Sequence, residues 1–173
     1  SASGLDSIEG NLKLWLSAEE AAVVTDDAGN VSAWIDWSGN KNHTIQSNVI
    51  KRPSYNQSGV IFDGIDDYLS SLTNINLQTM TMVAVSKLGK IDFTSTSNSG
   101  GAVISVQKNN LSDFDAIVYH EKDDRKYMNG SGGHVRSNNL VSSVAETDIG
   151  PTIIMNQIKT NAFKLFRNRE SVA

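Results

Sequence analysis

Hydrophobic and polar residues alternate with a period of two along much of this chain. Residues 12–16 carry leucine at every second position. Residues 31–38 repeat the pattern with Val31, Ala33, Ile35 and Trp37. This period turns alternate side chains toward opposite faces of a β-strand, so we expect two strands here, with Trp37 on the core side.

Further strands are expected along the rest of the chain, at residues 60–62, 68–72, 79–88, 102–107, 115–120, 152–158 and 162–167. Segments 81–85 and 153–155 lack clean alternation, which predicts strands covered on both faces. Clusters of Gly, Asn, Asp and Ser separate the strands and predict turns at 26–30, 38–42, 94–101 and 129–133. Helical periodicity is limited to one turn after Ser17.

Composition narrows the class of protein. The chain has 173 residues, a formal net charge of −4 and no cysteine. We expect one domain over residues 1–173, with a flexible N-terminal segment at 1–10. The scattered basic residues argue against nucleic-acid binding, and no apolar run has the length of a membrane span. Thiolate metal sites and a cysteine nucleophile are excluded.

Two segments carry a more specific pattern. Residues 34–40 read Trp-x-Asp-x-Ser-Gly-Asn, and residues 61–69 read Ile-Phe-Asp-Gly-x-Asp-Asp-Tyr-Leu. With Leu-Trp-Leu-Ser-Ala at 14–18 before them, they resemble the N-terminal half of laminin-G-like, concanavalin A-like jelly-roll domains. The resemblance covers roughly residues 10–90.

The resemblance implies an all-β fold, a jelly-roll sandwich of two antiparallel sheets. Segment 160–169 looks like a strand–turn–strand that further strands follow in the family, so we expect a sandwich that lacks its last strands. Such domains occur in phage structural proteins and in secreted bacterial proteins, which implies an extracellular or virion-surface location. The fold alone does not assign a function, because it hosts lectins, hydrolases, lyases and adhesion modules.

The two segments also hold the densest cluster of oxygen ligands. If their loops meet at one rim of the sandwich, Asp36, Asn40, Asn42, Asp63 and Asp67 could bind calcium, which takes six to eight oxygen ligands. Rim calcium is also what the family resemblance implies. Alternatively, Asp36 and Asp63 anchor turns by accepting backbone N–H groups, and this interpretation takes precedence. No cofactor is required by the sequence.

Aromatic side chains provide candidate ligand-binding residues. Trp15 and Trp34 lie opposite the aliphatic faces of their strands, where they could stack on sugar rings or pack into a second small core. Tyr55, Tyr119 and Tyr127 are expected as exposed stacking partners.

No catalytic motif is complete. Glu121-x-Asp123 lacks the third carboxylate of the laminarinase-type pattern, and segment 121–125 reads as a charged hairpin tip. We therefore expect a protein that is not an enzyme.

The leading hypothesis is a non-catalytic adhesion module that binds a cell-surface or matrix glycan through rim loops, with calcium assistance as an option. The second hypothesis is a structural virion domain, for capsid decoration or a tail, that binds neighbouring protein subunits. An open sheet edge would then pair with another subunit and give a homo-oligomer. A polysaccharide hydrolase or lyase ranks below both.

Overall fold

The computed structural model describes residues 8–75, 77, 79–89, 100–107, 114–121, 125–131, 135–136, 145–147, 149–159, 162–168 and 170–171. The described part is all-β with antiparallel sheets, as predicted. The chain divides into two compact units, residues 1–76 and 77–173. The single domain expected from its length stays a prediction. Residues 1–7 of the expected N-terminal segment and most of the 94–101 loop lie outside the described residues.

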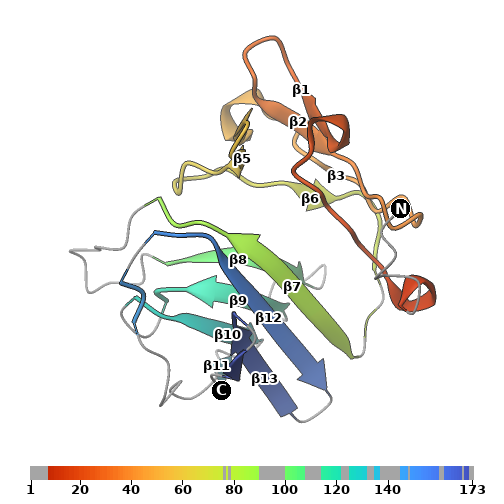
Figure 1. The fold of residues 1–173 in the computed structure, drawn as a ribbon. Coiled ribbons are helices and arrows are strands. Elements are labelled where there is room, and N and C mark those ends of the chain that lie inside the picture. Colours follow the sequence, from red (N-terminus) through yellow and green to blue (C-terminus); the bar gives the residue numbers. More distant parts are fainter. Residues whose placement is uncertain are drawn as a thin grey trace. The chain divides into compact units, whose positions relative to one another are not determined.

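The first unit contains one four-stranded sheet and one hairpin. The sheet has the order β1-β2-β3-β6, and β4 pairs with β5 (Figure 1). Its strands are β1 (Val23–Thr25), β2 (Val31–Trp34), β3 (Thr44–Ile45), β4 (Ser54–Asn56), β5 (Gly59–Ile61) and β6 (Ser70–Ser71). Three 3-10 turns accompany them, η1 (Glu9–Asn11), η2 (Glu20–Ala22) and η3 (Val49–Lys51).

Two expectations for this unit are wrong. Residues 12–16 form no strand, and Leu16 makes only an isolated bridge with Asp36. Strand β2 ends at Trp34 instead of continuing to residue 38. The alternation therefore breaks, so Asp36 is buried while Trp37 is 39% exposed, not in the core. The strand ends because the Asp36 side chain turns inward and accepts hydrogen bonds from the N–H groups of Ser38 and Asn42 in the turn after β2.

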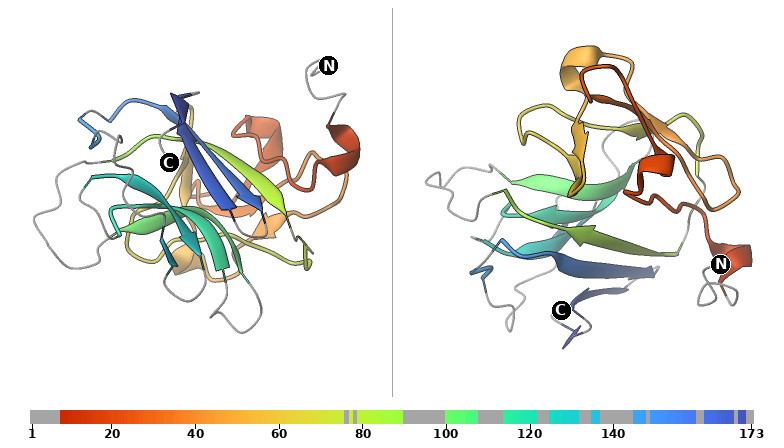
Figure 2. Two further views of the ribbon diagram at one scale, coloured as in Figure 1. Left: turned by 90° about the horizontal axis from the view of Figure 1, so that it is seen from below. Right: turned by 45° about the horizontal axis from the view of Figure 1, so that its top comes forward.

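The second unit is a β-sandwich. One sheet has the order β11-β10-β9-β8 and the other β14-β13-β12-β7, and Figure 2 shows them as two layers. The strands are β7 (Met80–Ser86), β8 (Gly101–Gln107), β9 (Phe114–Tyr119), β10 (Tyr127–Ser131), β11 (Val135–Arg136), β12 (Thr152–Lys159), β13 (Ala162–Arg167) and β14 (Glu170–Ser171). The long strands at 79–88, 102–107, 115–120, 152–158 and 162–167 are thereby confirmed.

The core of this unit lies between its two sheets. Side chains from both layers form one cluster: Met82, Ile117, Tyr119, Tyr127, Ile154, Ile158 and Leu165. Burial of this apolar surface provides the main stabilisation of the sandwich. The finer jelly-roll strand order remains a prediction.

The outer face of the β7–β12 pair is not covered as expected. Val83 is 57%, Val85 71% and Ile153 44% exposed, whereas Met82 and Ile154 between them are buried. Both strands thus have one buried and one open face. β-Branched side chains suit a half-exposed pleated surface, which is why an apolar run alone did not reveal the open face.

The turn expected at 129–133 does not begin at Asn129. Strand β10 continues to Ser131, and Asn129 is 2% exposed within it. Asn129 accepts a 2.7 Å hydrogen bond from the Nδ2 of buried Asn156 on β12. A polar pair between the sheets, not a solvated turn, explains this asparagine.

Candidate functional site

Asp36 organises the turn that follows β2. Its Oδ1 accepts the backbone N–H of Trp15 at 2.9 Å and of Ser38 at 2.8 Å. Its Oδ2 accepts the Ser38 hydroxyl at 2.7 Å and the Asn42 N–H at 2.9 Å. The side chain is 5% exposed. Both carboxylate oxygens are therefore occupied by donors of the protein itself.

The electrostatics of Asp36 follow from these contacts. Burial alone would raise the pKa of the carboxyl, but the hydrogen bonds from Trp15, Ser38 and Asn42 outweigh it and lower the pKa. The charge of Asp36 is thus balanced within the turn. This supports the interpretation of Asp36 as a turn anchor.

Asn40 and Asn42 are part of the same network. Each donates an Nδ2 hydrogen bond of 2.7 Å to a backbone carbonyl of the chain before β1, Asn40 to Leu12 and Asn42 to Lys13. The Oδ1 of Asn42 accepts the Thr73 hydroxyl. Three of the five expected calcium ligands therefore hold the 36–42 turn against the chain before β1.

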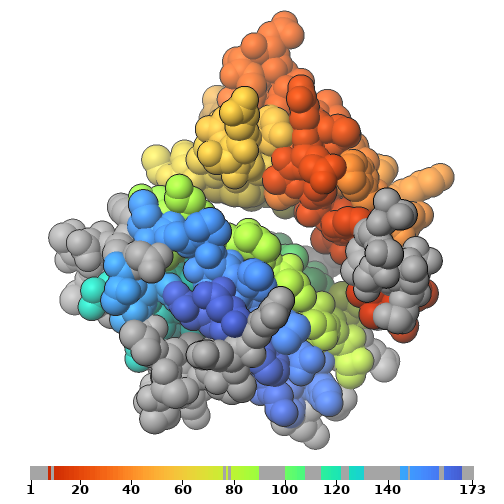
Figure 3. Space-filling view, viewed as in Figure 1, coloured from red at the N-terminus to blue at the C-terminus, as the bar shows by residue number. Residues whose placement is uncertain are grey.

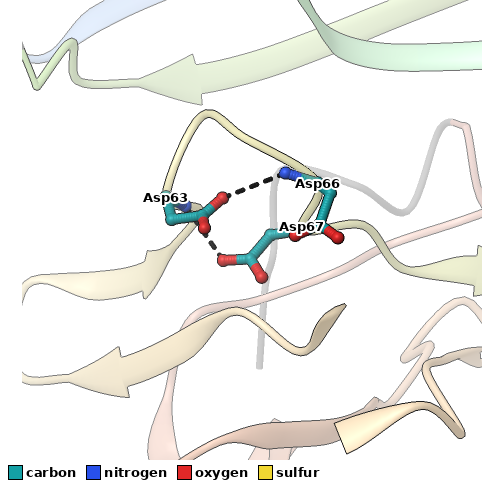
Figure 4. Close-up of side chains that lie close together, drawn as sticks. All are labelled: Asp63, Asp66 and Asp67. Carbon is teal, nitrogen blue, oxygen red and sulfur yellow. Dashed lines mark hydrogen bonds between the residues drawn. The ribbon is translucent and has the colours of Figure 1, made fainter. Parts of the chain in front are cut away.

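The remaining two expected ligands lie in the 63–67 loop. Carboxylate oxygens of Asp63, Asp66 and Asp67 lie within 4.8 Å of one another (Figure 4). Asp63 accepts N–H bonds from Ile65 at 2.8 Å and Asp66 at 3.3 Å, while its own N–H donates to Asp67 at 2.9 Å. The bond from Ile65 is the main cause of the lowered pKa of Asp63.

These three carboxylates are not evidence of a calcium site. Asp63 and Asp66 are exposed, and the Asp66 carboxylate is 3.6 Å from the Lys51 ammonium. Asp36 does not belong to the group. The loop is explained by its own hydrogen bonds, with Gly64 at φ 76° closing the turn. Calcium binding stays a hypothesis.

The tryptophans pack within the first unit. Trp15 and Trp37 meet edge to face, with ring centroids 6.0 Å apart and an interplanar angle of 81°. The Trp34 indole N–H donates to the Ser17 carbonyl. Trp15 and Trp34 are half-buried, as expected for side chains that pack under a loop.

The three tyrosines occupy different environments. Tyr55 is half-buried and donates its hydroxyl to the Ala18 carbonyl at 3.0 Å. Tyr119 and Tyr127 are only 4% and 3% exposed, with ring centroids 4.9 Å apart in the core of the sandwich. The expected exposure of these two rings is wrong, because β9 and β10 turn them toward the opposite sheet. Burial also raises the pKa of Tyr127.

A pocket in the second unit was not predicted from the sequence. It has a volume of about 280 Å³ and lies on the face of β8 and β9 opposite the cluster between the two sheets, beside a second buried cluster formed by Ala116, Val118 and Met128. Its lining consists of Gly100, Gly101, Ala102, Ser105, Gln107, Phe114, Ala116, Val118 and Glu121.

Strand register builds the floor of this pocket. The cross-strand pairs are Ala102 with Val118, Ser105 with Ala116, and Gln107 with Phe114. A bulge between Ala102 and Ile104 shifts the register, so residues 105 and 107 share a face with residue 102. A strict period of two would place residues 102 and 105 on opposite faces of the strand. The pocket therefore could not be predicted from the sequence pattern, which does not contain the bulge.

Gly100 closes one end of the pocket. A Cβ atom at this position would lie 2.0 Å from the Tyr119 carbonyl oxygen and 2.5 Å from the His120 carbonyl carbon. Only glycine permits this approach of the chain to the end of β9. His120 itself turns there with φ 53°, and its Nδ1 accepts the Arg125 N–H at 3.0 Å. Strands β9 and β10 pair antiparallel on either side of the expected 121–125 hairpin tip, of which residues 122–124 lie outside the described residues.

Comparisons with known proteins found no matching family model, no similar curated protein and no similar solved structure. The laminin-G-like resemblance therefore remains a prediction. Within the described residues, no helix combines the length and the apolar character that crossing a membrane would need.

Proposed function

We propose that this protein is a non-catalytic binding module whose β8–β9 pocket holds one sugar unit of a glycan. The observation that carries the proposal is the pocket's composition. A floor of small apolar side chains is combined with one aromatic ring, one amide, one hydroxyl and one carboxylate. Mostly apolar concavities with a few convergent polar groups are the usual form of a small-ligand site.

The chemistry of this lining suits a sugar. The C–H face of a pyranose can lie on half-buried Phe114 and exposed Ala102, with buried Ala116 and Val118 beneath them. Its hydroxyl groups can donate to Glu121 and exchange hydrogen bonds with Gln107 and Ser105. The volume of about 280 Å³ suits a single ring rather than a longer oligosaccharide.

The same lining supports a binding role over catalysis. Among the described residues that line the pocket, Glu121 is the one carboxylate. Glycoside hydrolysis generally uses a pair of carboxylates on either side of the scissile bond. The resemblance to laminin-G-like modules adds the setting, an adhesion domain outside the cell or on a virion.

Binding to a panel of neutral and acidic oligosaccharides, followed by calorimetry with the best binder, tests this proposal. The variant Gln107→Ala loses one hydrogen-bonding group, so we expect affinity to fall about 3- to 10-fold. Gln57→Ala is the matched control, because Gln57 is an exposed glutamine too but lies in the β4–β5 turn. No binding across the panel, or equal effects of the two variants, would refute the pocket as the site.

A further inference from the structure

The two long edge strands of the sandwich differ in how they are protected. β7 and β8 each have seven residues and each lies at the end of its sheet. A sheet edge offers unpaired N–H and C=O groups to another chain, and natural proteins usually protect it with charges, prolines or bulges. Strand β8 has such protection, a bulge between Ala102 and Ile104.

Strand β7 has none of these devices. Its sequence, Met-Thr-Met-Val-Ala-Val-Ser, contains no charge, proline or glycine. All seven residues pair with β12 in one unbroken register, so the strand is regular. Among the strands that the structure describes, none pairs with its other edge.

The outer face beside this edge is apolar and open. Val83 and Val85 of β7 are 57% and 71% exposed, and Ile153, which pairs with Val85, is 44% exposed. In the space-filling view the atoms of β7 and β12 lie side by side at the surface (Figure 3). Such a combination of bare edge and apolar face is typical of a surface that another chain covers.

We propose that two copies of this chain associate through β7, antiparallel and about a twofold axis near Val83. The two sheets that contain β7 then become one continuous sheet across the dimer. This inference goes beyond the proposed glycan binding, because it uses the other sheet of the sandwich and none of the residues that line the pocket.

Self-complementarity is the reason for choosing a second copy as the partner. In a pairing centred on Val83, Thr81 of each copy lies opposite Val85 of the other, and Met82 lies opposite Ala84. No charge lies opposite a like charge, because the strand has none. Val83 and Val85 of both copies then form one apolar surface, and buried Met82 of each copy extends the inner face. A twofold interface of this kind is closed, so it gives a dimer and not a fibre.

Cysteine cross-linking tests the contact directly. The chain has no cysteine, so Val83→Cys introduces its sole thiol. We expect a short thiol-to-thiol cross-linker to convert this variant to a covalent dimer at protein concentrations where the wild type sediments as a dimer. Val103→Cys is the matched control, because Val103 is an exposed valine on the protected edge strand β8. A monomeric wild type at all concentrations, or equal cross-linking of both variants, would overturn the proposal.

Charge substitution tests the twofold symmetry. Val83→Glu and Val83→Lys each place like charges opposite one another, so each variant should dissociate at least 10-fold more readily in sedimentation. An equimolar mixture of the two should regain association, because opposite charges then meet. Dissociation without recovery in the mixture would show that the copies do not meet at β7. Circular dichroism checks that both variants fold, and the cross-linking result decides the question if either does not.

Discussion

The Asp36 carboxylate accepts the backbone N–H of Trp15 at 2.9 Å, across 21 residues of sequence. This bond joins the segment before β1 to the turn after β2, where Trp37 donates its N–H back to the Trp15 carbonyl at 2.9 Å. A residue that could be read as a metal ligand is thus a tertiary anchor.

Asp36→Asn tests this role. The amide keeps one acceptor oxygen but presents an NH₂ group to a backbone donor, so we expect a loss of about 1–3 kcal/mol in the free energy of unfolding. Urea denaturation followed by tryptophan fluorescence measures it. Asp63→Asn is the control on an exposed loop and should lower the free energy of unfolding less than Asp36→Asn does. Equal effects would contradict the anchor role.

The stability of the protein should fall as the pH drops below about 4, the ordinary pKa of an aspartate side chain. The pKa values of Asp26, Asp36 and Asp63 are all lowered from 3.8 in the folded protein. A carboxyl with a lowered folded pKa stabilises the fold above its unfolded pKa, and this contribution is lost as the pH falls from about 4 toward the folded value. Thermal melts between pH 7 and pH 2.5 should show this decline. The decline should be shallower in Asp36→Asn, and an unchanged slope would argue against the shift at Asp36.

Calcium should have little effect on stability. Both carboxylate oxygens of Asp36 and the Oδ1 of Asn42 accept hydrogen bonds within the protein, and Lys51 lies beside Asp66. We therefore expect the melting temperature to shift by less than about 1 °C between excess calcium and chelator. A clear rise with calcium that disappears in Asp67→Asn would instead establish a site in the 63–67 loop.

Gly100→Ala should disrupt the end of the β8–β9 pocket. The added Cβ would lie 2.0 Å from the Tyr119 carbonyl oxygen, so the backbone must move. We expect a loss of about 2–3 kcal/mol in stability, as for overpacked sites. Gly101→Ala is the matched control, because nothing lies within 4 Å of its Cβ position. Chemical denaturation of both variants compares them, and similar stabilities would show that the close approach is not needed.

The ion pair between Glu146 and Arg167 should contribute far more to the free energy of unfolding than the exposed pair between Lys51 and Asp66. Its two bonds are both 2.6 Å, and Glu146 is 3% exposed. We expect Glu146→Gln to lose about 3 kcal/mol, the low end for a broken buried pair, because the Arg167 side chain remains 34% exposed. Asp66→Asn breaks the exposed pair with Lys51 and should lose less than about 1 kcal/mol. Thermal unfolding of both variants measures the two losses of stability. Equal losses would contradict this ranking.

The sequence by itself determined the class of fold and most long strands. Alternation predicted the strand that begins at Val31 and became β2, because a period of two depends only on local backbone geometry. Short apolar segments bounded by turn residues predicted β12 and its partner β13. The prediction that Asp36 anchors a turn likewise rested on local chemistry, since aspartate commonly accepts N–H bonds from the residues that follow it.

Only the tertiary structure decided which faces are buried and where the β8–β9 pocket lies. Tyr119 and Tyr127 are core residues because a second sheet covers them, and Val83 is exposed because nothing described covers its face. The pocket depends on a bulge that shifts the register of β8 against β9. Burial and register are relations between segments distant in sequence, so no local pattern of residues contains them.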